Sequence, residues 1–150
     1  MKVDYFTIPE ITVSYKDNVK TSERAVIGST EDAAKLFAVA FKDCMEHHEE
    51  VYVLFLNQAN RVLGISNIAK GGIAGTFVDV KIILQIALKV SASAIMLSHN
   101  HPSGSIIPSS DDLVMTKAIQ KGCKAVGIKL LDHVIMSEEN YCSFADEGLL

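Results

Sequence analysis

The sequence has few cysteines and prolines, and it contains no tryptophan. Its cysteines, Cys44, Cys123 and Cys142, are far apart and form no Cys-x-x-Cys pair. This spacing argues against a disulfide framework and against a zinc site built from thiolates. We therefore interpret the three cysteines as buried or incidental thiols in a reducing compartment.

Long apolar runs are also absent. The first residues lack the apolar core of a signal peptide, and no apolar stretch approaches the roughly 20 residues that a membrane helix needs. We expect a soluble, cytoplasmic protein with no membrane contact. The net charge of −4, without a dense run of Lys or Arg, argues against broad electrostatic binding to nucleic acid.

The composition that remains is typical of a globular domain. Hydrophobic residues make up 49% and charged residues 21% of the 150 residues, with no internal repeat or obvious linker. A chain of this length can bury one core, so we expect a single domain over residues 1–150.

The hydrophobic pattern predicts alternating strands and helices. Residues 10–16 alternate as in a strand with one wet face, which would make residues 1–20 an N-terminal strand extension. After a loop at 17–28, we expect helices at about 29–44, 80–90 and 109–122, strands at 51–56, 61–69, 93–98 and 128–136, and an irregular tail. The helix at 80–90 is apolar nearly all round and is expected to be buried. This order predicts an α/β sandwich with a mixed sheet.

The most informative segment spans residues 98–112. His99 and His101 follow an apolar strand, and residues two apart in an extended chain face the same side, so both imidazoles can reach one metal ion. Pro102 ends the strand, and Gly104 lets the chain turn back. The next helix places Asp112 in its first turn, in phase with the expected buried face, where a carboxylate needs a partner.

Each of these features also has a plain structural reading. Histidines at strand ends are common, and Ser109 with Asp112 can be a simple capping box. Together, however, His99, His101 and Asp112 predict a three-ligand Zn²⁺ site with a fourth position for water, as in a catalytic centre.

A catalytic zinc site also needs a general base. Glu50, at the head of the central strand, is the best candidate, and its neighbour Glu49 is the rival. Strand parity places Glu50 on the face of Tyr52 and Leu54, but parity alone does not choose between the two carboxylates.

This constellation resembles the JAMM motif of the RadC family, which belongs to the JAB/MPN class. That motif is an upstream Glu, then His-x-His, seven residues, Ser, two residues and Asp, read here as Glu50, His99-Asn100-His101, Ser109 and Asp112. Further similarity lies at residues 50–57, 71–76, 130–133 and 143–148, so the resemblance covers roughly residues 20–150.

The resemblance implies a cytidine-deaminase-like fold of the JAB/MPN class and a zinc-dependent hydrolase. His99, His101 and Asp112 would bind Zn²⁺, and Glu50 rather than Glu49 would be the general acid and base. Ser109 would donate a hydrogen bond to the oxyanion or orient the zinc water. The substrate would be a protein or peptide, cleaved at a peptide or isopeptide bond.

Two other functions remain open. One is a non-catalytic JAB/MPN binding module, and the other is a DNA-repair accessory protein, as the family name suggests. Longer RadC proteins carry an N-terminal helix-hairpin-helix region associated with DNA contact, for which this chain has no room, so the DNA-repair label transfers poorly.

Four further features have both a functional and a structural interpretation. The pair 132–133 (Asp-His) could support or bind a metal, or could be a hydrogen-bonded strand pair. Ser98 could support the zinc site or face the other side of its strand. His47 and His48 suit a helix end better than a metal site. The loop 71–76 could border a substrate groove or form a plain turn.

Overall fold

Five strands form one mixed sheet in the computed structural model, which describes residues 9–71 and 77–150. The strands are β1 (Glu50–Leu56), β2 (Val62–Lys70), β3 (Ala94–Asn100), β4 (Lys129–Met136) and β5 (Tyr141–Ser143). Their order is β2-β1-β3-β4-β5. Only β3 and β4 are parallel, because α3 carries the chain back across the sheet between them, whereas the other neighbours are antiparallel.

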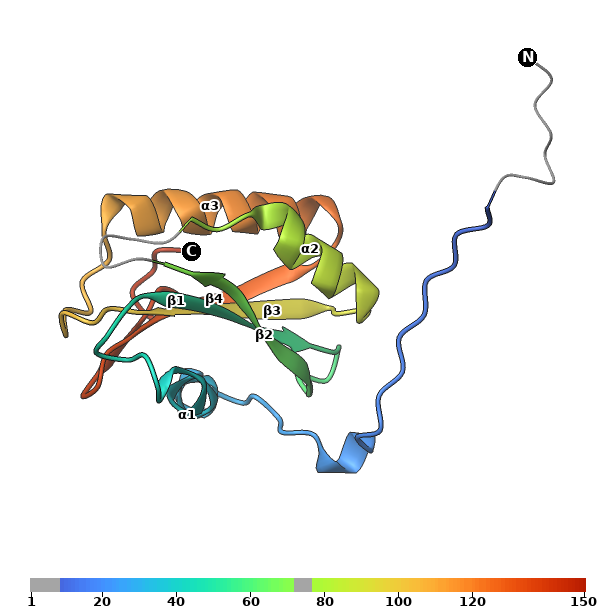
Figure 1. Cartoon of the computed structure of the whole chain (residues 1–150), viewed down its shortest axis with the longest axis horizontal. Coiled ribbons are helices and arrows are strands. Elements are labelled where there is room, and N and C mark those ends of the chain that lie inside the picture. The colour runs from blue at the N-terminus through green and yellow to red at the C-terminus, as the bar shows by residue number, and fades with distance from the viewer. Residues whose placement is uncertain (1–8, 72–76) are drawn as a thin grey trace, which may run out of the picture.

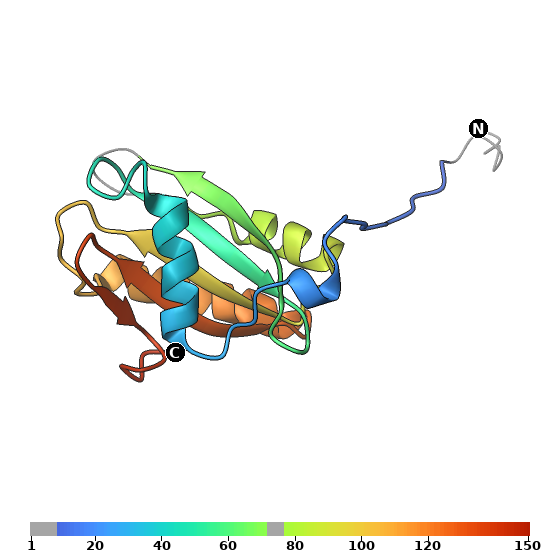
Figure 2. The same ribbon diagram turned by 90° about the horizontal axis from the view of Figure 1, so that it is seen from below.

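Three helices cover the sheet, with α1 on one face and α2 and α3 on the other (Figure 1). Their bounds are Thr30–Phe41 for α1, Val80–Lys89 for α2 and Ser110–Ala125 for α3, and a short 3-10 helix, η2, spans Thr21–Glu23. Each α-helix begins after a side-chain cap, from Ser29, Asp79 and Ser109 respectively. Figure 2 shows α1 lying across its face of the sheet. This mixed sheet with three helices is consistent with the expected JAB/MPN α/β fold.

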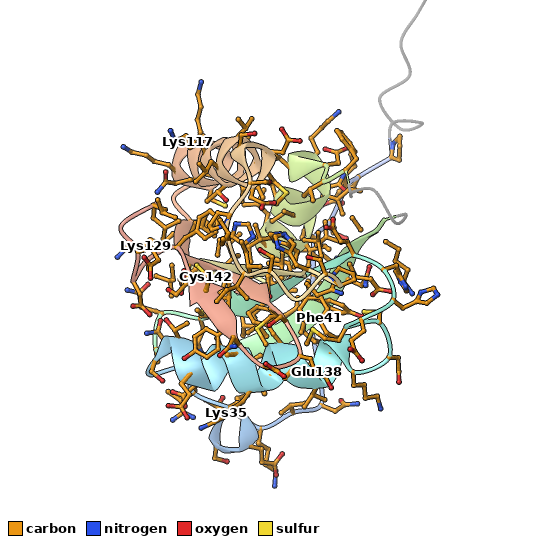
Figure 3. The ribbon with its side chains drawn as sticks, turned by 90° about the vertical axis from the view of Figure 1, so that its left-hand side faces the viewer. Lys35, Phe41, Lys117, Lys129, Glu138 and Cys142 are labelled. Carbon is orange, nitrogen blue, oxygen red and sulfur yellow. The ribbon has the colours of Figure 1, made fainter. Side chains whose placement is uncertain are left out.

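The central strands are buried on both faces, and their alternation divides the core in two. Along β1, Tyr52, Leu54 and Leu56 pack toward α1, together with Phe37 and Phe41. The residues between them face α2 and α3, and this second cluster includes Val51, Val53, Phe55, Leu97 and Ile119. Figure 3 shows labelled Phe41 between the sheet and α1, and labelled Lys117 on α3 pointing outward. The side of β1 that a residue occupies therefore decides which helices it meets.

The N-terminal part of the chain differs from its prediction. Residues 9–20 form no strand, and Ile11 and Val13 are 89% and 72% exposed. Alternation alone does not make a strand, because a strand also needs an edge to pair with. The described part of the chain first contacts the sheet at Tyr15, whose hydroxyl oxygen lies 3.2 Å from the Leu63 carbonyl oxygen, and an isolated bridge joins Val26 to Arg61.

Two further elements also differ from their predictions. The tail is not wholly irregular, since β5 pairs with β4 at the sheet edge. Helix α2 is not buried all round: Ile83 and Ala87 are buried, but Ile82 and Leu88 are 41% and 53% exposed. No described element covers its outer face, so apolar residues there stay in water. Among the described residues, no helix is long and apolar enough to cross a bilayer.

Candidate metal centre

The two histidines lie where β3 reaches the end of the sheet. Strand β3 continues through His99, which pairs in register with Val51 of β1 and Ile135 of β4. The chain leaves the strand at His101, whose backbone N–H still donates to the Met136 carbonyl at 2.9 Å. Gly104 then takes a φ of 83°, a left-handed conformation that glycine adopts without strain, and the chain turns toward α3.

The third ligand is fixed by the start of α3. The Ser109 hydroxyl accepts from the Asp112 backbone N–H at 3.1 Å, and the Asp112 carboxylate accepts from the Ser109 N–H at 2.8 Å. This reciprocal capping box holds the Asp112 side chain at the first turn of the helix. The interpretation of Ser109 and Asp112 as a capping box is therefore confirmed. The cap still allows Asp112 to bind a metal, because the carboxylate has a second oxygen.

The three side chains converge on one point. His99 Nε2 lies 2.9 Å from His101 Nε2 and 3.1 Å from Asp112 Oδ1, and His101 Nε2 lies 3.6 Å from Asp112 Oδ2. Such a group of nitrogen and oxygen atoms could hold a metal ion. The structure thus brings the three predicted ligands together.

A buried hydrogen-bond chain sets the tautomer of His99. Thr116 donates its hydroxyl proton to the Asp112 carbonyl at 2.6 Å, so its oxygen is left to accept from His133 Nδ1, also at 2.6 Å. Burial lowers the pKa of His133 well below its ordinary value, so this ring is neutral and its Nε2 accepts. His99 Nδ1 lies 2.7 Å away and is the donor, which leaves the His99 Nε2 lone pair facing His101 and Asp112.

His101 is oriented by a simpler contact. Its Nδ1 lies 2.7 Å from the carbonyl oxygen of Ser105, which can only accept, so Nδ1 carries the proton. The Nε2 lone pair of His101 then faces the same point as that of His99. Without metal, a proton on Nε2 can bridge His101 to Asp112, and a metal ion that accepts an N, N, O donor set, such as Zn²⁺, would take the place of that proton.

Electrostatics favour a cation at this point. Burial opposes ionisation of Asp112, but hydrogen bonds that His101 and His99 donate to it when no metal is bound outweigh burial and hold the pKa of Asp112 well below its ordinary value. Contact with Asp112 raises the pKa of His101 from 6.5, and the charge of Glu49 adds to that rise. Asp112 is therefore ionised at neutral pH, and Glu49 lies within electrostatic reach of His101.

The ligands border an open cavity of about 520 Å³. Polar groups of the cavity come from His99, His101, Ser109, Asp111, Asp112 and Glu49. Its apolar side is formed by Val51, Phe77, Val78, Val80, Val114, Met115 and Ala118. Phe77 and Val114 are 86% and 68% exposed, so an apolar surface adjoins the metal ligands.

The structure does not bring Glu50 to this cavity, and this corrects its expected position. Glu50 lies on the α1 face of the sheet, where its carboxylate contacts His48 and Asn67. The reason is strand alternation: Val51 pairs with His99 and shares its face, so Glu50 points the other way and Glu49 points toward the cavity. The choice between Glu49 and Glu50 requires knowing that Val51 lies opposite His99, and only the pairing of β1 with β3 shows this.

The other singled-out residues divide between the two faces. His133 supports His99, whereas Asp132 binds Thr30, Ser143 and the Ala145 N–H at the α1 side. Ser98 faces away from the histidines and donates to the Val134 carbonyl at 2.7 Å. Of the loop 71–76, residues 72–76 lie outside the described residues. No pattern in the sequence points to Thr116, because only the packing of α3 against β4 brings it to His133.

Comparison with known proteins agrees with this arrangement. Residues 27–149 match the family model described as RadC-like JAB domain. The chain belongs to this family. Proteins similar to this RadC-like chain carry the name UPF0758 protein: one from Flavobacterium johnsoniae is 46% identical over 68% of this chain and 44% of its own length, and one from Listeria monocytogenes is 38% identical over 87% and 57%.

The chain therefore spans about half the length of the curated relatives it matches. Another relative, from Porphyromonas gingivalis, is 45% identical over 68% of this chain and 45% of its own length. The matched part contains the RadC-like JAB domain with its His-His-Asp candidate metal site.

Proposed function

We propose that this domain is a JAMM-type zinc metallopeptidase that hydrolyses a peptide or isopeptide bond. The observation that carries the proposal is that three converging ligands and a further carboxylate, Glu49, border one solvent-open cavity. Three protein ligands leave a coordination position for water or substrate. When bound, zinc would supply Lewis acidity toward a carbonyl oxygen and lower the pKa of a water molecule.

We assign the general acid and base to Glu49. Its side chain lines the cavity beside His101 and Asp112, whereas that of Glu50 lies on the opposite face. A carboxylate at this position can take a proton from the attacking water and deliver it to the leaving amine.

Ser109 is suited to stabilise the negative charge that develops on the substrate oxygen. Its oxygen accepts the Asp112 N–H, so its hydroxyl proton is left to point into the cavity that Ser109 lines. Such a donor at an oxyanion contributes most when it is already oriented. The helix cap fixes the position of the Ser109 oxygen before substrate arrives, and its hydroxyl proton stays available to the substrate oxygen.

The lining of the cavity supports a peptide substrate with an apolar side chain. Phe77, Val114 and Met115 offer apolar contact beside the metal ligands. The acidic residues Glu49, Asp111 and Asp112 in the same cavity would repel phosphates, which argues against nucleic acid as the substrate of this site.

A pair of neighbouring variants tests the proposal. Zinc-loaded protein is assayed with fluorescence-quenched peptides that carry either a peptide bond or a lysine isopeptide bond between apolar residues. We expect Glu49→Gln to lose about 100-fold or more of kcat while it keeps its zinc, because it can no longer carry the proton. Glu50→Gln is the matched comparison, with the same change one residue along on the other face.

A larger loss of kcat in Glu50→Gln than in Glu49→Gln would show that Glu50, not Glu49, is the general acid and base. If zinc-loaded wild-type protein cleaves none of the peptides, the proposed hydrolase is wrong and the binding-module interpretation stands. His101→Ala checks the metal ligands separately, because it should lower the zinc content. Equal zinc in this variant and the wild type would exclude the ligand assignment.

A further inference from the structure

A second group of potential metal ligands lies on the α1 face of the sheet. Cys44, in the turn after α1, His48 and Glu50 each offer a ligand atom, and these atoms lie within 4.8 Å of one another. Cys44 and Glu50 are buried, and His48 is half-buried. The group is separated from His99, His101 and Asp112 by the sheet itself, because Glu50 and Val51 point to opposite faces.

The turn that carries these residues is held in place by Asn100. The Asn100 amide nitrogen lies 3.2, 3.0 and 2.9 Å from the carbonyl oxygens of Cys44, Met45 and His48. Its amide oxygen accepts the Glu50 backbone N–H at 2.8 Å. One buried side chain thus fixes the backbone of all three ligands, so little ordering remains to be done when a metal binds.

The side chains are oriented as well as the backbone. Glu50 Oε1 lies 2.7 Å from His48 Nε2, and Asn67 donates to the other carboxylate oxygen. Without metal, His48 Nε2 donates to the Glu50 carboxylate. Because His48 Nδ1 lies 2.8 Å from His47 Nδ1, the ring proton can be held on Nδ1 when a metal takes Nε2.

The charge of the group also favours a cation. Burial disfavours ionisation of Glu50, but hydrogen bonds from His48 and Tyr52 and the charge of Lys70 outweigh it and lower its pKa. The Lys70 ammonium is 3.8 Å from the carboxylate on a side chain that is 70% exposed and free to turn toward solvent. Because Lys70 is a weakly held counter-ion, a cation bound close to the buried Glu50 carboxylate would stabilise its charge considerably.

We propose that Cys44, His48 and Glu50 bind a second zinc ion on the face of the sheet opposite the proposed catalytic site. Sulfur, nitrogen and carboxylate oxygen are the three ligand types of protein zinc sites, and a mixed set of three leaves a fourth position for water. Binding releases the Cys44 thiol proton to solvent and forms a Zn–S bond. A thiolate, a carboxylate and a neutral imidazole then balance the charge of Zn²⁺.

The properties of Cys44 match a ligand better than a nucleophile. Burial is the main cause that raises its pKa to about 11, so without metal it is a protonated, unreactive thiol. A coordinated metal ion displaces such a proton directly. The side chain is also 5% exposed, which keeps it from meeting a substrate.

Cobalt distinguishes this site from the other one, since only this site contains sulfur. The full chain is freed of metal and loaded with Co²⁺, and the near-ultraviolet band of thiolate-to-cobalt charge transfer is measured. We expect the band in the wild type and its loss in Cys44→Ala. Cys123→Ala is the matched control, since Cys123 is equally buried but lies on α3, and it should keep the band. His101→Ala should keep it too.

Zinc content gives the second measurement. We expect two zinc ions per folded wild-type chain, from the two ligand groups, and one in Cys44→Ala. Zinc-edge X-ray absorption of the wild type should show a sulfur scatterer, and this test needs no variant in case Cys44→Ala does not fold. Zinc-saturated wild type without a sulfur scatterer, or a cobalt band that persists in Cys44→Ala, would overturn the second site and leave the proposed hydrolase untouched.

Discussion

Single hydrogen atoms decide whether the histidines can bind a metal. His99 presents Nε2 only because His133 accepts the proton of its Nδ1, and His133 accepts only because Thr116 holds the proton on the other side of its ring. Each link is buried, so water cannot replace a missing partner. The candidate metal site therefore depends on Thr116, a residue that no ligand motif includes.

Thr116→Val tests this chain of hydrogen bonds. Valine keeps the shape of threonine but offers no acceptor to His133, so the ring loses its fixed tautomer. We expect zinc affinity to fall about 10-fold or more, measured by competition with a chromophoric chelator. Ser98→Ala is the control, because it removes a buried hydroxyl from the other face of β3 and should leave zinc affinity unchanged. Equal affinities in all three proteins would contradict the role of Thr116.

At the scale of elements, the site depends on how closely α3 approaches its neighbours. Gly122 of α3 faces α2, and a Cβ atom added there would lie 2.9 Å from Val80 Cγ1 and 3.4 Å from Leu84 Cδ1. This absence of a side chain lets the two helices share one face of the sheet. Asp112 and Thr116 reach β3 and β4 from the same helix, so the helix position matters to the ligands.

Gly122→Ile should force the two helices apart. Overpacking of this kind costs about 1–3 kcal/mol of unfolding free energy, measured by urea denaturation. Lys121→Ile, one residue along on the exposed side of α3, should cost only a few tenths of a kcal/mol through helix propensity. Similar losses of unfolding free energy in both variants would mean that contact with α2 does not cause the destabilisation.

For the whole molecule, the chain before α1 is tied to the sheet by a small polar cluster. Asp17 accepts hydrogen bonds from Tyr15 and Arg24. Arg24 also donates to the Leu63 carbonyl of β2, and the Tyr15 hydroxyl oxygen lies 3.2 Å from the same carbonyl oxygen. Hydrogen bonds from Tyr15, then Arg24, lower the pKa of Asp17 from 3.8 to about 2. The cluster therefore stabilises the fold above the ordinary pKa, and this contribution is lost as the pH falls toward 2.

Tyr15→Phe should raise the pKa of Asp17 back toward 3.8, because it removes the largest cause of the shift. The carboxyl titration is followed by NMR in the folded protein. Tyr141→Phe, at the other edge of the sheet, is the control and should leave the titration of Asp17 unchanged. An unshifted Asp17 in the wild type would show that the cluster of Tyr15, Asp17 and Arg24 does not form in solution.

Local patterns in the sequence were sufficient to predict most of the elements. The helices expected at 29–44, 80–90 and 109–122 are present, and they begin after caps at Ser29, Asp79 and Ser109, because a cap needs only residues within one turn. His99 and His101 could be paired as ligands because the period of an extended chain is fixed. The strand predicted at 10–16 failed for the opposite reason, since a strand needs a partner that local sequence does not name.

The sequence by itself determined the ligand types, their spacing and the alternating order of strands and helices. The tertiary structure decided which residues meet. Pairing of Val51 with His99 sent Glu49 to the cavity and Glu50 to the opposite face, where it joins Cys44 and His48. Packing of α3 brought Thr116 to His133. Such contacts join residues far apart in the chain, and strand register and helix packing, unlike spacing, are properties of the whole fold.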